Sequence, residues 1–329
     1  MKGVNKSKEV VAALETLSDF LGLEKSRLLA AKKDILDLYA GGIQGGAFLP
    51  DILDFEFSFK AKIGSSDIIP ALRYTNYVFY DQKKYGENPK LAEIIQKKRL
   101  ASVKKVFLRH GLLSQKNKKL LDLLFEENAD KEYLAPVQFG AHLEKSGAIL
   151  KTYFWCDEKY ALPDKARRAK LSDLVRSNFY FKGNRDFLKN GKIFFFSVDF
   201  KGKDRSLKIY TLYKGYEQLF KDLCQYGFKE QTWTKLKDFV RENRKHLDDA
   251  PVVCFQIMNG KLSVKKVEIF IRKKYRNTAA ADEIRGLFLD NFNIKIKKQI
   301  NSQKIIKNIY VFSVGEEFVT VYSRFKLWN

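Results

Sequence analysis

The 329 residues include 62 Lys and Arg against 39 Asp and Glu, giving a formal net charge of +23, and 45% of them are hydrophobic and 14% aromatic. This composition excludes a disordered chain, and the length allows one large domain or two with a substantial core. The charge favours an anionic partner: a nucleic acid, a membrane surface or a phosphorylated small molecule. No apolar run approaches the length of a membrane span or a signal-peptide core, which predicts a cytoplasmic protein.

The first third of the chain reads as a helix, a strand pair and more helix. Apolar residues recur at helical intervals over 7–40, and GGIQGG at 41–46 ends that pattern. We expect residues 1–45 to pack as a helical segment on the outside of the fold. Residues 53–62 and 68–80 alternate as two strands around the turn IGSSD, and helical spacing returns over 89–127 with a break near Gly111.

Four more strand pairs follow, separated by helical segments. The expected pairs are 133–144 with 149–156, 192–200 with 205–213, 251–257 with 262–272, and 304–314 with 318–325. The expected helices lie at 164–178, near 214–246 and near 279–291. Three cysteines and three histidines are widely spaced and form no metal-binding pattern.

Five hairpins interleaved with helices make a repeated α-β-β-α unit, in which identities drift but the architecture recurs. The predicted fold is α+β: one domain over residues 1–329, in which a ten-stranded antiparallel β-barrel of five hairpins is surrounded by helices. Closure removes exposed strand edges, and a barrel of this width leaves a central chamber. The competing arrangement is an open antiparallel sheet covered by one layer of helices.

A lysine followed two positions later by an aromatic residue recurs in the hairpins. The pairs are Lys151 with Tyr153 and Lys208 with Tyr210, and a related form has Lys266, Glu268 and Phe270 at nearly the same interval along the chain. Alternate residues of a strand share a face, so one face carries cations and rings while the other is mostly apolar. We predict that the polar face is the active surface. A register slip of one residue would turn Lys265 inward in place of Lys266.

The hairpins resemble those of the ABBA-fold aromatic prenyltransferases, and most of all the cyanobactin-type enzymes that prenylate ribosomal peptides. The resemblance rests on Glu56-x-Ser58-x-Lys60, Arg73 with Tyr74, LKTY at 150–153, FFFSVDFKGKDRSLKIY at 194–210 and IKNIYVF at 306–312. It covers most of the chain and is weak in the first forty residues. The chain has no DDxxD-type aspartate cluster, which separates it from the isoprenyl chain-elongating enzymes.

The resemblance implies roles for the inward residues. It assigns diphosphate binding to Arg73, Lys151, Lys208 and Lys266, shielding of the allyl cation to Tyr153, Tyr210 and Phe270, and acid/base catalysis to Glu56. Further inward positions are Glu268, Arg272, Tyr310, Tyr322 and Arg324. Glu268 reads either as a second acid/base residue or as a salt-bridge partner of Lys266, and Glu56 either as the base or as a plain strand carboxylate.

The chemistry of prenyl transfer suits such a face. Ionising the carbon–oxygen bond leaves a diphosphate, which fixed cations stabilise, and an allyl cation, which ring faces stabilise. The resemblance implies dimethylallyl or geranyl diphosphate as donor, Mg²⁺ as an optional bridge to the diphosphate, and a peptide or an aromatic small molecule as acceptor of a monomeric enzyme. The alternative is a nucleic-acid-binding protein, favoured by the net charge and by lysines interleaved with aromatic residues on strands. Against it, the sequence has no recognised nucleic-acid motif and its basic residues are scattered, so we expect neither a nucleic acid nor a membrane as partner.

Overall fold

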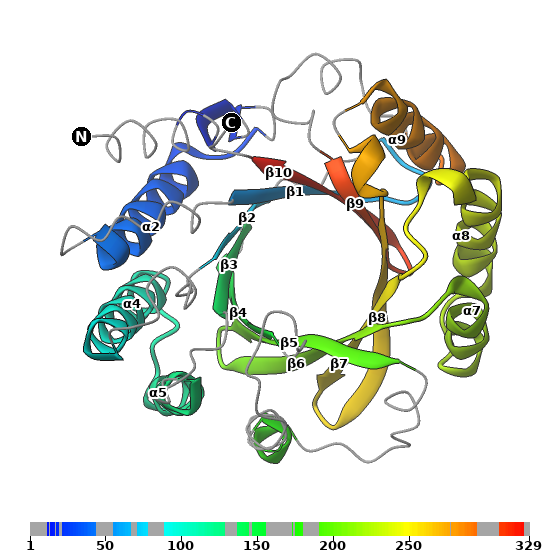
Figure 1. Cartoon of the computed structure of the whole chain (residues 1–329). Helices are drawn as coiled ribbons and strands as arrows, with labels where there is room; N and C mark the ends of the chain where they lie inside the picture. Colours follow the sequence, from blue (N-terminus) through cyan, green and yellow to red (C-terminus); the bar gives the residue numbers. More distant parts are fainter. Residues whose placement is uncertain are drawn as a thin grey trace.

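Ten antiparallel strands form a closed barrel with helices around it (Figure 1). The computed structural model describes residues 12, 14–16, 18–19, 22–43, 55–66, 71–77, 89–128, 137–144, 147–155, 173, 175–179, 191–276, 278–294 and 309–325. The strands are β1 (Phe55–Lys62), β2 (Leu72–Tyr77), β3 (Val137–Glu144), β4 (Gly147–Trp155), β5 (Lys192–Lys201), β6 (Asp204–Leu212), β7 (Val252–Met258), β8 (Lys261–Phe270), β9 (Ile309–Val314) and β10 (Phe318–Phe325).

Each strand pairs with its neighbours in the chain, and the ring is closed by β1 and β10. These two strands pair over their whole lengths, from Phe55 opposite Phe325 to Lys62 opposite Phe318. The predicted five hairpins and the barrel are therefore confirmed, and the alternative open sheet is wrong because β1 has a partner on both sides.

The helices lie on the outside of the barrel, as Figure 1 shows. They are α2 (Lys25–Ile43), α4 (Pro89–Arg109), α5 (Gln115–Asn128), α7 (Tyr216–Gln225), α8 (Glu230–Asn243) and α9 (Ala279–Asn291), with short 3₁₀ turns η2 (Arg244–His246) and η3 (Lys273–Tyr275). The predicted break near Gly111 is confirmed, since α4 ends there with a left-handed glycine (φ 67°). Of the helix expected at 164–178, the described residues 173 and 175–178 are helical.

The expected single helix over 7–40 is wrong in one respect. The described residues from 12 to 19 are helical, but the chain then turns at Gly22 (φ 61°) and α2 begins only at Lys25. The amides of Gly22 and Leu23 bond back to the carbonyls of Asp19 and Ser18, which is how a glycine ends a helix. The apolar spacing continues across this turn, and that continuity hid the break in the sequence.

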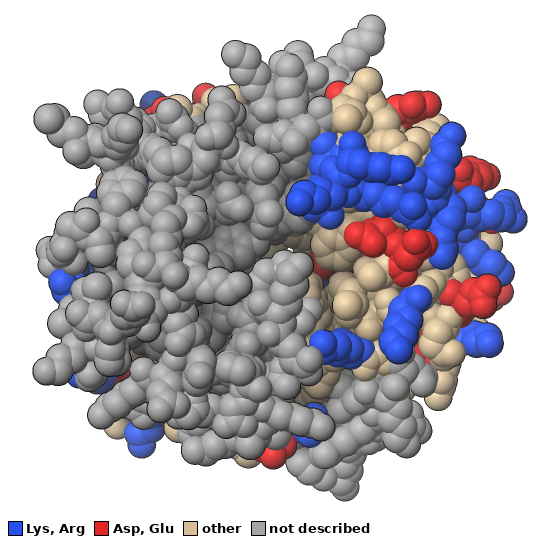
Figure 2. All heavy atoms as spheres, viewed as in Figure 1, with Lys and Arg blue, Asp and Glu red and all other residues tan. Residues whose placement is uncertain are grey.

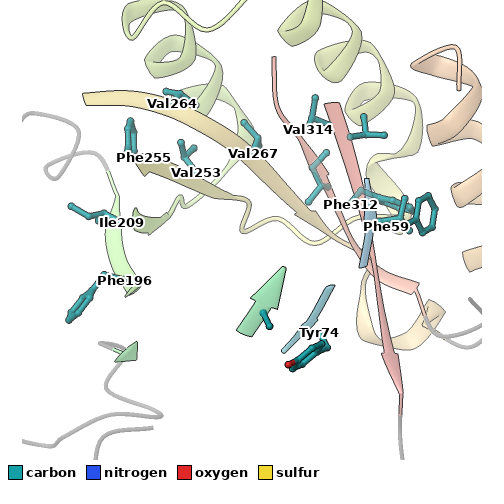
Figure 3. Packing of buried hydrophobic residues seen from close by; sticks show 14 of the residues in the cluster. Phe59, Tyr74, Phe196, Ile209, Val253, Phe255, Val264, Val267, Phe312 and Val314 are labelled. Atoms are coloured by element: carbon teal, nitrogen blue, oxygen red, sulfur yellow. The ribbon is translucent and has the colours of Figure 1, made fainter. Parts of the chain in front are cut away.

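The hydrophobic core lies between the outer face of the barrel and the helices. Alternate strand residues such as Phe59, Ile209, Phe255 and Phe312 are buried there and belong to one large cluster (Figure 3). The ring of Phe312 stacks on Phe288 of α9 with centroids 4.3 Å apart. Burying this outer face against helices leaves the other face of every strand to line the interior.

The hairpin between β7 and β8 shows how the turns fix the register. Asn259 and Gly260 both have positive φ, 51° and 75°, as a two-residue hairpin turn of the primed type requires. One extra residue, Lys265, forms a bulge further along β8, because Cys254 pairs with Lys266 while Phe255 pairs with Val264. The bulge places Lys266 opposite Cys254, which in turn pairs with Tyr210. Lys266 therefore shares the face of Tyr210, as predicted for the inward lysine.

Charge is also abundant on the outer surface. Figure 2 shows Lys and Arg side chains gathered over one side of the visible face, near α8 and α9, with Asp and Glu among them. Part of the excess charge is therefore solvated surface. None of the helices within the described ranges is long and apolar enough to cross a membrane.

Candidate active site

The predicted Lys-x-aromatic face lines the interior of the barrel. The residues between its members, such as Leu150, Ile209 and Val267, belong to the core beneath the helices, so the lysines and rings point the other way. Cross-strand register joins the interior residues into a continuous surface: Lys151 pairs with Asp199, Ser197 with Lys208, Tyr210 with Cys254, and Cys254 with Lys266.

One carboxylate holds two of the predicted diphosphate ligands. Lys208 donates a hydrogen bond to Oδ2 of Asp199, and Nζ of Lys151 lies 3.8 Å from the same oxygen. The Ser197 hydroxyl donates to Oδ1 at 3.4 Å. Burial alone would raise the pKa of Asp199, but Lys208 and Lys151 outweigh it and hold that pKa below its ordinary value. The result is a fixed negative charge between two ammonium groups.

Lys266 forms a second polar group with residues of β8 and β10. It donates to Glu268 Oε1 at 2.5 Å and to the Tyr322 hydroxyl at 2.6 Å, and it lies 5.5 Å from the ring centroid of Tyr210. Burial opposes its charge, but Glu268 and Tyr322 outweigh burial and hold the pKa of Lys266 well above its usual value. Glu268 is therefore a salt-bridge partner of Lys266, one of its two predicted roles.

Arg73 and Lys60 extend the cationic surface across β1 and β2. Nη2 of Arg73 lies 3.3 Å from Nε2 of His142, and Nε2 also lies 3.2 Å from Oε1 of Glu144. Lys60 sits over the Phe318 ring, 3.8 Å from its centroid. Burial and the surrounding cations, Arg73 first among them, hold the pKa of His142 far below its ordinary range, so its imidazole is neutral.

These cations are buried close to one another, and their pKa values are lowered as a result. Burial, followed by the neighbouring Lys208, lowers the pKa of Lys151 to about 7. Burial, followed by Arg73 and Lys265, lowers that of Lys60 to about 8, and burial lowers that of Arg73 to about 10. The charged forms of these groups are disfavoured in the free protein, and a bound anion would stabilise them.

Aromatic side chains gather beside the cations. Phe195 and Tyr210 stack with ring centroids 4.0 Å apart, and Tyr153 lies 5.9 Å from Phe195 and 6.3 Å from Tyr210. Val252 and Cys254 complete the buried cluster, and the predicted Phe270 packs against it. Tyr153 and Tyr210 therefore contact the same cluster, and Phe270 lies at its edge.

The structure does not bring all predicted residues into this group. Arg272 lies beyond the end of β8, where it donates to the Leu247 carbonyl at 2.5 Å and to Asp249 at 2.9 Å. Glu56 stands opposite Arg324 and Thr75 in the register, on the face of Ser58 and Lys60. The side chains of Glu56, Arg324 and Tyr310 lie outside the described residues.

Three interior residues were not assigned from the sequence. Lys60 and Asp199 stand inside motifs that carry the family resemblance, and alternation alone places them on the faces of Ser58 and Ser197. Phe195 lies two positions before Ser197 in the same strand, so alternation places it on that face as well. A strand sequence fixes the face of a residue but not its partners on other strands. The electrostatic effect of Arg73 on Lys60, the bond of Lys208 to Asp199 and the stacking of Tyr210 on Phe195 were therefore not predictable.

The arrangement suits a phosphorylated ligand with an apolar, electron-deficient end. Ammonium and guanidinium groups bind phosphate oxygens, and ring faces stabilise a cation. The described residues contain no group of three or more His, Cys, Asp and Glu side chains that could hold a metal ion. Two carboxylates of this surface, Asp199 and Glu268, are engaged by lysines, and a third, Glu144, lies beside His142. The donor set thus fits direct contact with an anion better than direct ligation of Mg²⁺.

Comparisons with protein-family models and with curated proteins find no match to this sequence. Solved structures match it over nearly its whole length. PriB, in a binary complex with product diphosphate, is 13% identical with a TM-score of 0.64, the match covering 97% of this chain and 95% of that one. The 6-dimethylallyltryptophan synthase from Micromonospora olivasterospora, in complex with DMASPP and Trp, is 13% identical with a TM-score of 0.65, covering 97% and 96%.

A further structure, described as a 6-dimethylallyl tryptophan synthase, is 14% identical with a TM-score of 0.65 over 96% of this chain and 95% of that one. At 13–14% identity, the similarity to these structures establishes the fold and nothing further. The chain therefore has the ABBA prenyltransferase fold that the resemblance implied: ten antiparallel strands in a barrel, ringed by helices.

Proposed function

We propose that this protein transfers a prenyl group from an allylic diphosphate to a nucleophilic acceptor. The observation that carries the proposal is the pairing of two surfaces inside one closed barrel. Lys60, Arg73, Lys151 and Lys208 provide a cationic surface, and the stacked rings of Phe195 and Tyr210 lie next to it. The diphosphate and DMASPP bound by proteins of the same fold support a diphosphate donor.

The reaction uses the two surfaces in turn. The bond between the allylic carbon and the diphosphate oxygen breaks, and its electron pair leaves with the diphosphate, whose growing charge the lysines and Arg73 stabilise. The allyl cation is held against the rings of Tyr153, Tyr210 and Phe195, each worth about 1–2 kcal/mol when desolvated. The acceptor atom then bonds to that carbon and loses its proton to a carboxylate, for which we propose Glu56.

The donor we propose is dimethylallyl diphosphate, with geranyl diphosphate as the longer alternative. The acceptor class is an aromatic small molecule or a side chain of a ribosomal peptide, including the cyanobactin type. We propose a monomer working in the cytoplasm. If Mg²⁺ takes part, it enters bound to diphosphate oxygens, because the cations around the site repel a free metal ion.

The test is isothermal calorimetry with non-hydrolysable dimethylallyl thiodiphosphate, run with and without Mg²⁺. We expect saturable one-to-one binding in the unmodified protein, and at least about tenfold weaker binding in Lys208→Met, since a charge-assisted contact is worth about 1.5–3 kcal/mol. The matched control is Lys237→Met, which removes one exposed charge from the outer helix α8 and should leave affinity unchanged.

Transfer is then measured with dimethylallyl diphosphate, tryptophan and a panel of aromatic acceptors and short peptides. Glu56→Gln should bind the thiodiphosphate normally and slow transfer. Absence of thiodiphosphate binding in the unmodified protein, or equal loss in Lys208→Met and Lys237→Met, would contradict the proposal.

The nucleic-acid alternative rested on lysines interleaved with aromatic residues. In the barrel those residues point inward, away from any strand of nucleic acid on the surface. A parallel titration with short single-stranded RNA provides the comparison. Tight, strongly salt-dependent RNA binding without thiodiphosphate binding would favour the alternative.

A further inference from the structure

Asp199 is an anion at the centre of a surface proposed to bind an anion. It lies on β5 between Lys151 of β4 and Ser206 of β6, and it is 7% exposed. Among the described residues, the titratable groups that share this interior surface come from eight other strands: Lys60 on β1, Arg73 on β2, His142 and Glu144 on β3, Lys151 and Tyr153 on β4, Lys208 and Tyr210 on β6, Cys254 on β7, Lys266 and Glu268 on β8, and Tyr322 on β10. A negative charge here repels a diphosphate, so its presence needs a reason.

The contacts of Asp199 supply one. A single oxygen, Oδ2, accepts the bond from Lys208 and faces Lys151 at 3.8 Å, while the other oxygen accepts from Ser197. Two ammonium groups that share one carboxylate oxygen are held close together on adjacent sides of one strand. Without that oxygen they would face each other directly, and like charges in a poorly solvated site repel strongly.

We infer that Asp199 is a positioning residue, which holds Lys151 and Lys208 as a pair of charged donors spaced for neighbouring diphosphate oxygens. The inference rests on the proposed function for the identity of the ligand. Asp199 itself need not touch the ligand: it holds the two lysine nitrogens in place and favours the protonated form of Lys151 until the diphosphate supplies its own negative charge. Losing Asp199 should therefore matter most at the pH values where Lys151 loses its proton.

The physical signature is a pH-dependent defect. In Asp199→Asn the two ammonium groups repel each other without compensation, so the pKa of Lys151, already about 7, falls further. At pH 8 the variant must take up a proton to bind the anion, and each unit by which the pKa has fallen weakens binding about tenfold. At pH 6 that cost is small, and the missing negative charge favours the ligand.

The experiment compares dissociation constants of dimethylallyl thiodiphosphate for the unmodified protein and Asp199→Asn between pH 6 and pH 8.5. The ionisation of the ligand is common to both proteins, so the ratio of the two constants isolates the protein. We expect the dissociation constant of Asp199→Asn, divided by that of the unmodified protein, to be at or below one at pH 6 and about ten or more at pH 8. Asp204→Asn, which removes an exposed carboxylate from the turn of the same hairpin, is the control and should give a ratio near one throughout.

A double-mutant cycle separates positioning from a merely structural role. If Asp199 acts through the lysine pair, adding Asp199→Asn to Lys151→Met should cost little further affinity at pH 8, because no second ammonium remains to be repelled. Melting temperatures of all variants establish that the comparison is between folded proteins. A ratio that is constant with pH, or a full additive loss in the double variant, would overturn the inference.

One measurement does not need the ligand. Lysines labelled by reductive ¹³C-methylation titrate individually by NMR, with Lys151→Met and Lys208→Met identifying the resonances. The midpoint of Lys151 should be lower in Asp199→Asn than in the unmodified protein, and an unchanged midpoint would refute the positioning role. If instead the midpoint moves but the unmodified protein binds no thiodiphosphate, the positioning stands and the proposed function fails.

Discussion

Lys151 shows what a buried cation costs the fold. Burial and Lys208 lower its pKa from 10.5 to about 7, so protonating it is harder in the folded chain than in the unfolded one. The penalty is fully present below pH 7 and fades as the pH rises toward 10.5. Asp199 bonds to Lys208 as well, so removing Lys151 leaves no carboxylate without a partner.

We therefore predict that Lys151→Met makes the ligand-free protein more stable. The expected gain in the free energy of unfolding is about 1–3 kcal/mol at pH 6, the range found when buried charges are replaced by apolar side chains. It should be smaller at pH 9.5, as measured by urea unfolding at both values. The matched variant is Lys208→Met, which leaves Asp199 with the more distant Lys151 and should lose stability; a gain in both variants would be inconsistent with this view.

At the same scale, the sequence identified some interior residues and not others for a physical reason. Lys151, Tyr153, Lys208 and Tyr210 were found because a strand alternates its faces and the pairs recur. Asp199 was passed over because a lone aspartate in an apolar strand reveals nothing of the two lysines across it. Those neighbours come from the register of β4, β5 and β6, which the hairpin turns determine.

At the scale of elements, one buried carboxylate, Asp34, adds polar contacts to the apolar packing of helix α2 on the barrel. Oδ2 of Asp34 accepts a hydrogen bond from the Tyr74 hydroxyl at 2.7 Å and lies 2.7 Å from Nε2 of His110, while Oδ1 accepts from Arg109. Asp34 is fully buried. Three elements, α2, α4 and β2, thus meet at one side chain on the outer face of the barrel.

We predict that Asp34→Ala lowers the free energy of unfolding by about 3–5 kcal/mol, because Arg109 and two buried polar groups lose their common partner. Asp37→Ala removes a partly exposed partner of Arg109 and should cost about 0–1 kcal/mol. Tyr74 lies on the outer face of the barrel, in the core under the helices, so thiodiphosphate affinity per folded molecule should survive in both. Chemical denaturation and calorimetry measure the two quantities, and a selective loss of affinity in Asp34→Ala would argue against this division of roles.

The element boundaries differ in how far the sequence could predict them. The strands were found because alternation and turn residues coincide, as at Asn259 and Gly260. The break at Gly22 was missed because a glycine within a run of helical spacing is also compatible with a continuous helix. In the structure, the left-handed conformation of Gly22 and the bonds from the Gly22 and Leu23 amides to Asp19 and Ser18 end the first helix.

At the scale of the whole molecule, the barrel closes only when its last strand, β10, is in place. β10 pairs with β1 on one side and β9 on the other, and Val319 and Val321 of β10 are buried in the core under the helices. The five-hairpin pattern predicted this closure, since ten strands in sequence order leave two edges that only each other can satisfy. The stagger of the strands around the barrel, called the shear, could not be predicted from the sequence. The shear determines which interior residues lie at the same height in the barrel.

We predict that a chain ending at Ile294, without β9 and β10, does not form a smaller barrel. It should expose the edges of β1 and β8, bind the dye ANS, sediment as aggregates and bind no thiodiphosphate, whereas the full chain does the reverse. Size-exclusion chromatography and dye fluorescence provide the measurement. A monomeric, cooperatively unfolding truncated chain would show that the remaining strands can close without β10.

The seam between β1 and β10 also sets an order of events during synthesis. β1 is among the first strands to leave the ribosome, and its eight-residue partner strand is the last of the ten. From the synthesis of β1 until that of β10, the edge of β1 that β10 covers has no permanent neighbour, and the unfinished sheet can pair with other nascent chains. We therefore expect the edge of β1 to be the part of the sheet most prone to aggregation until β10 pairs with it.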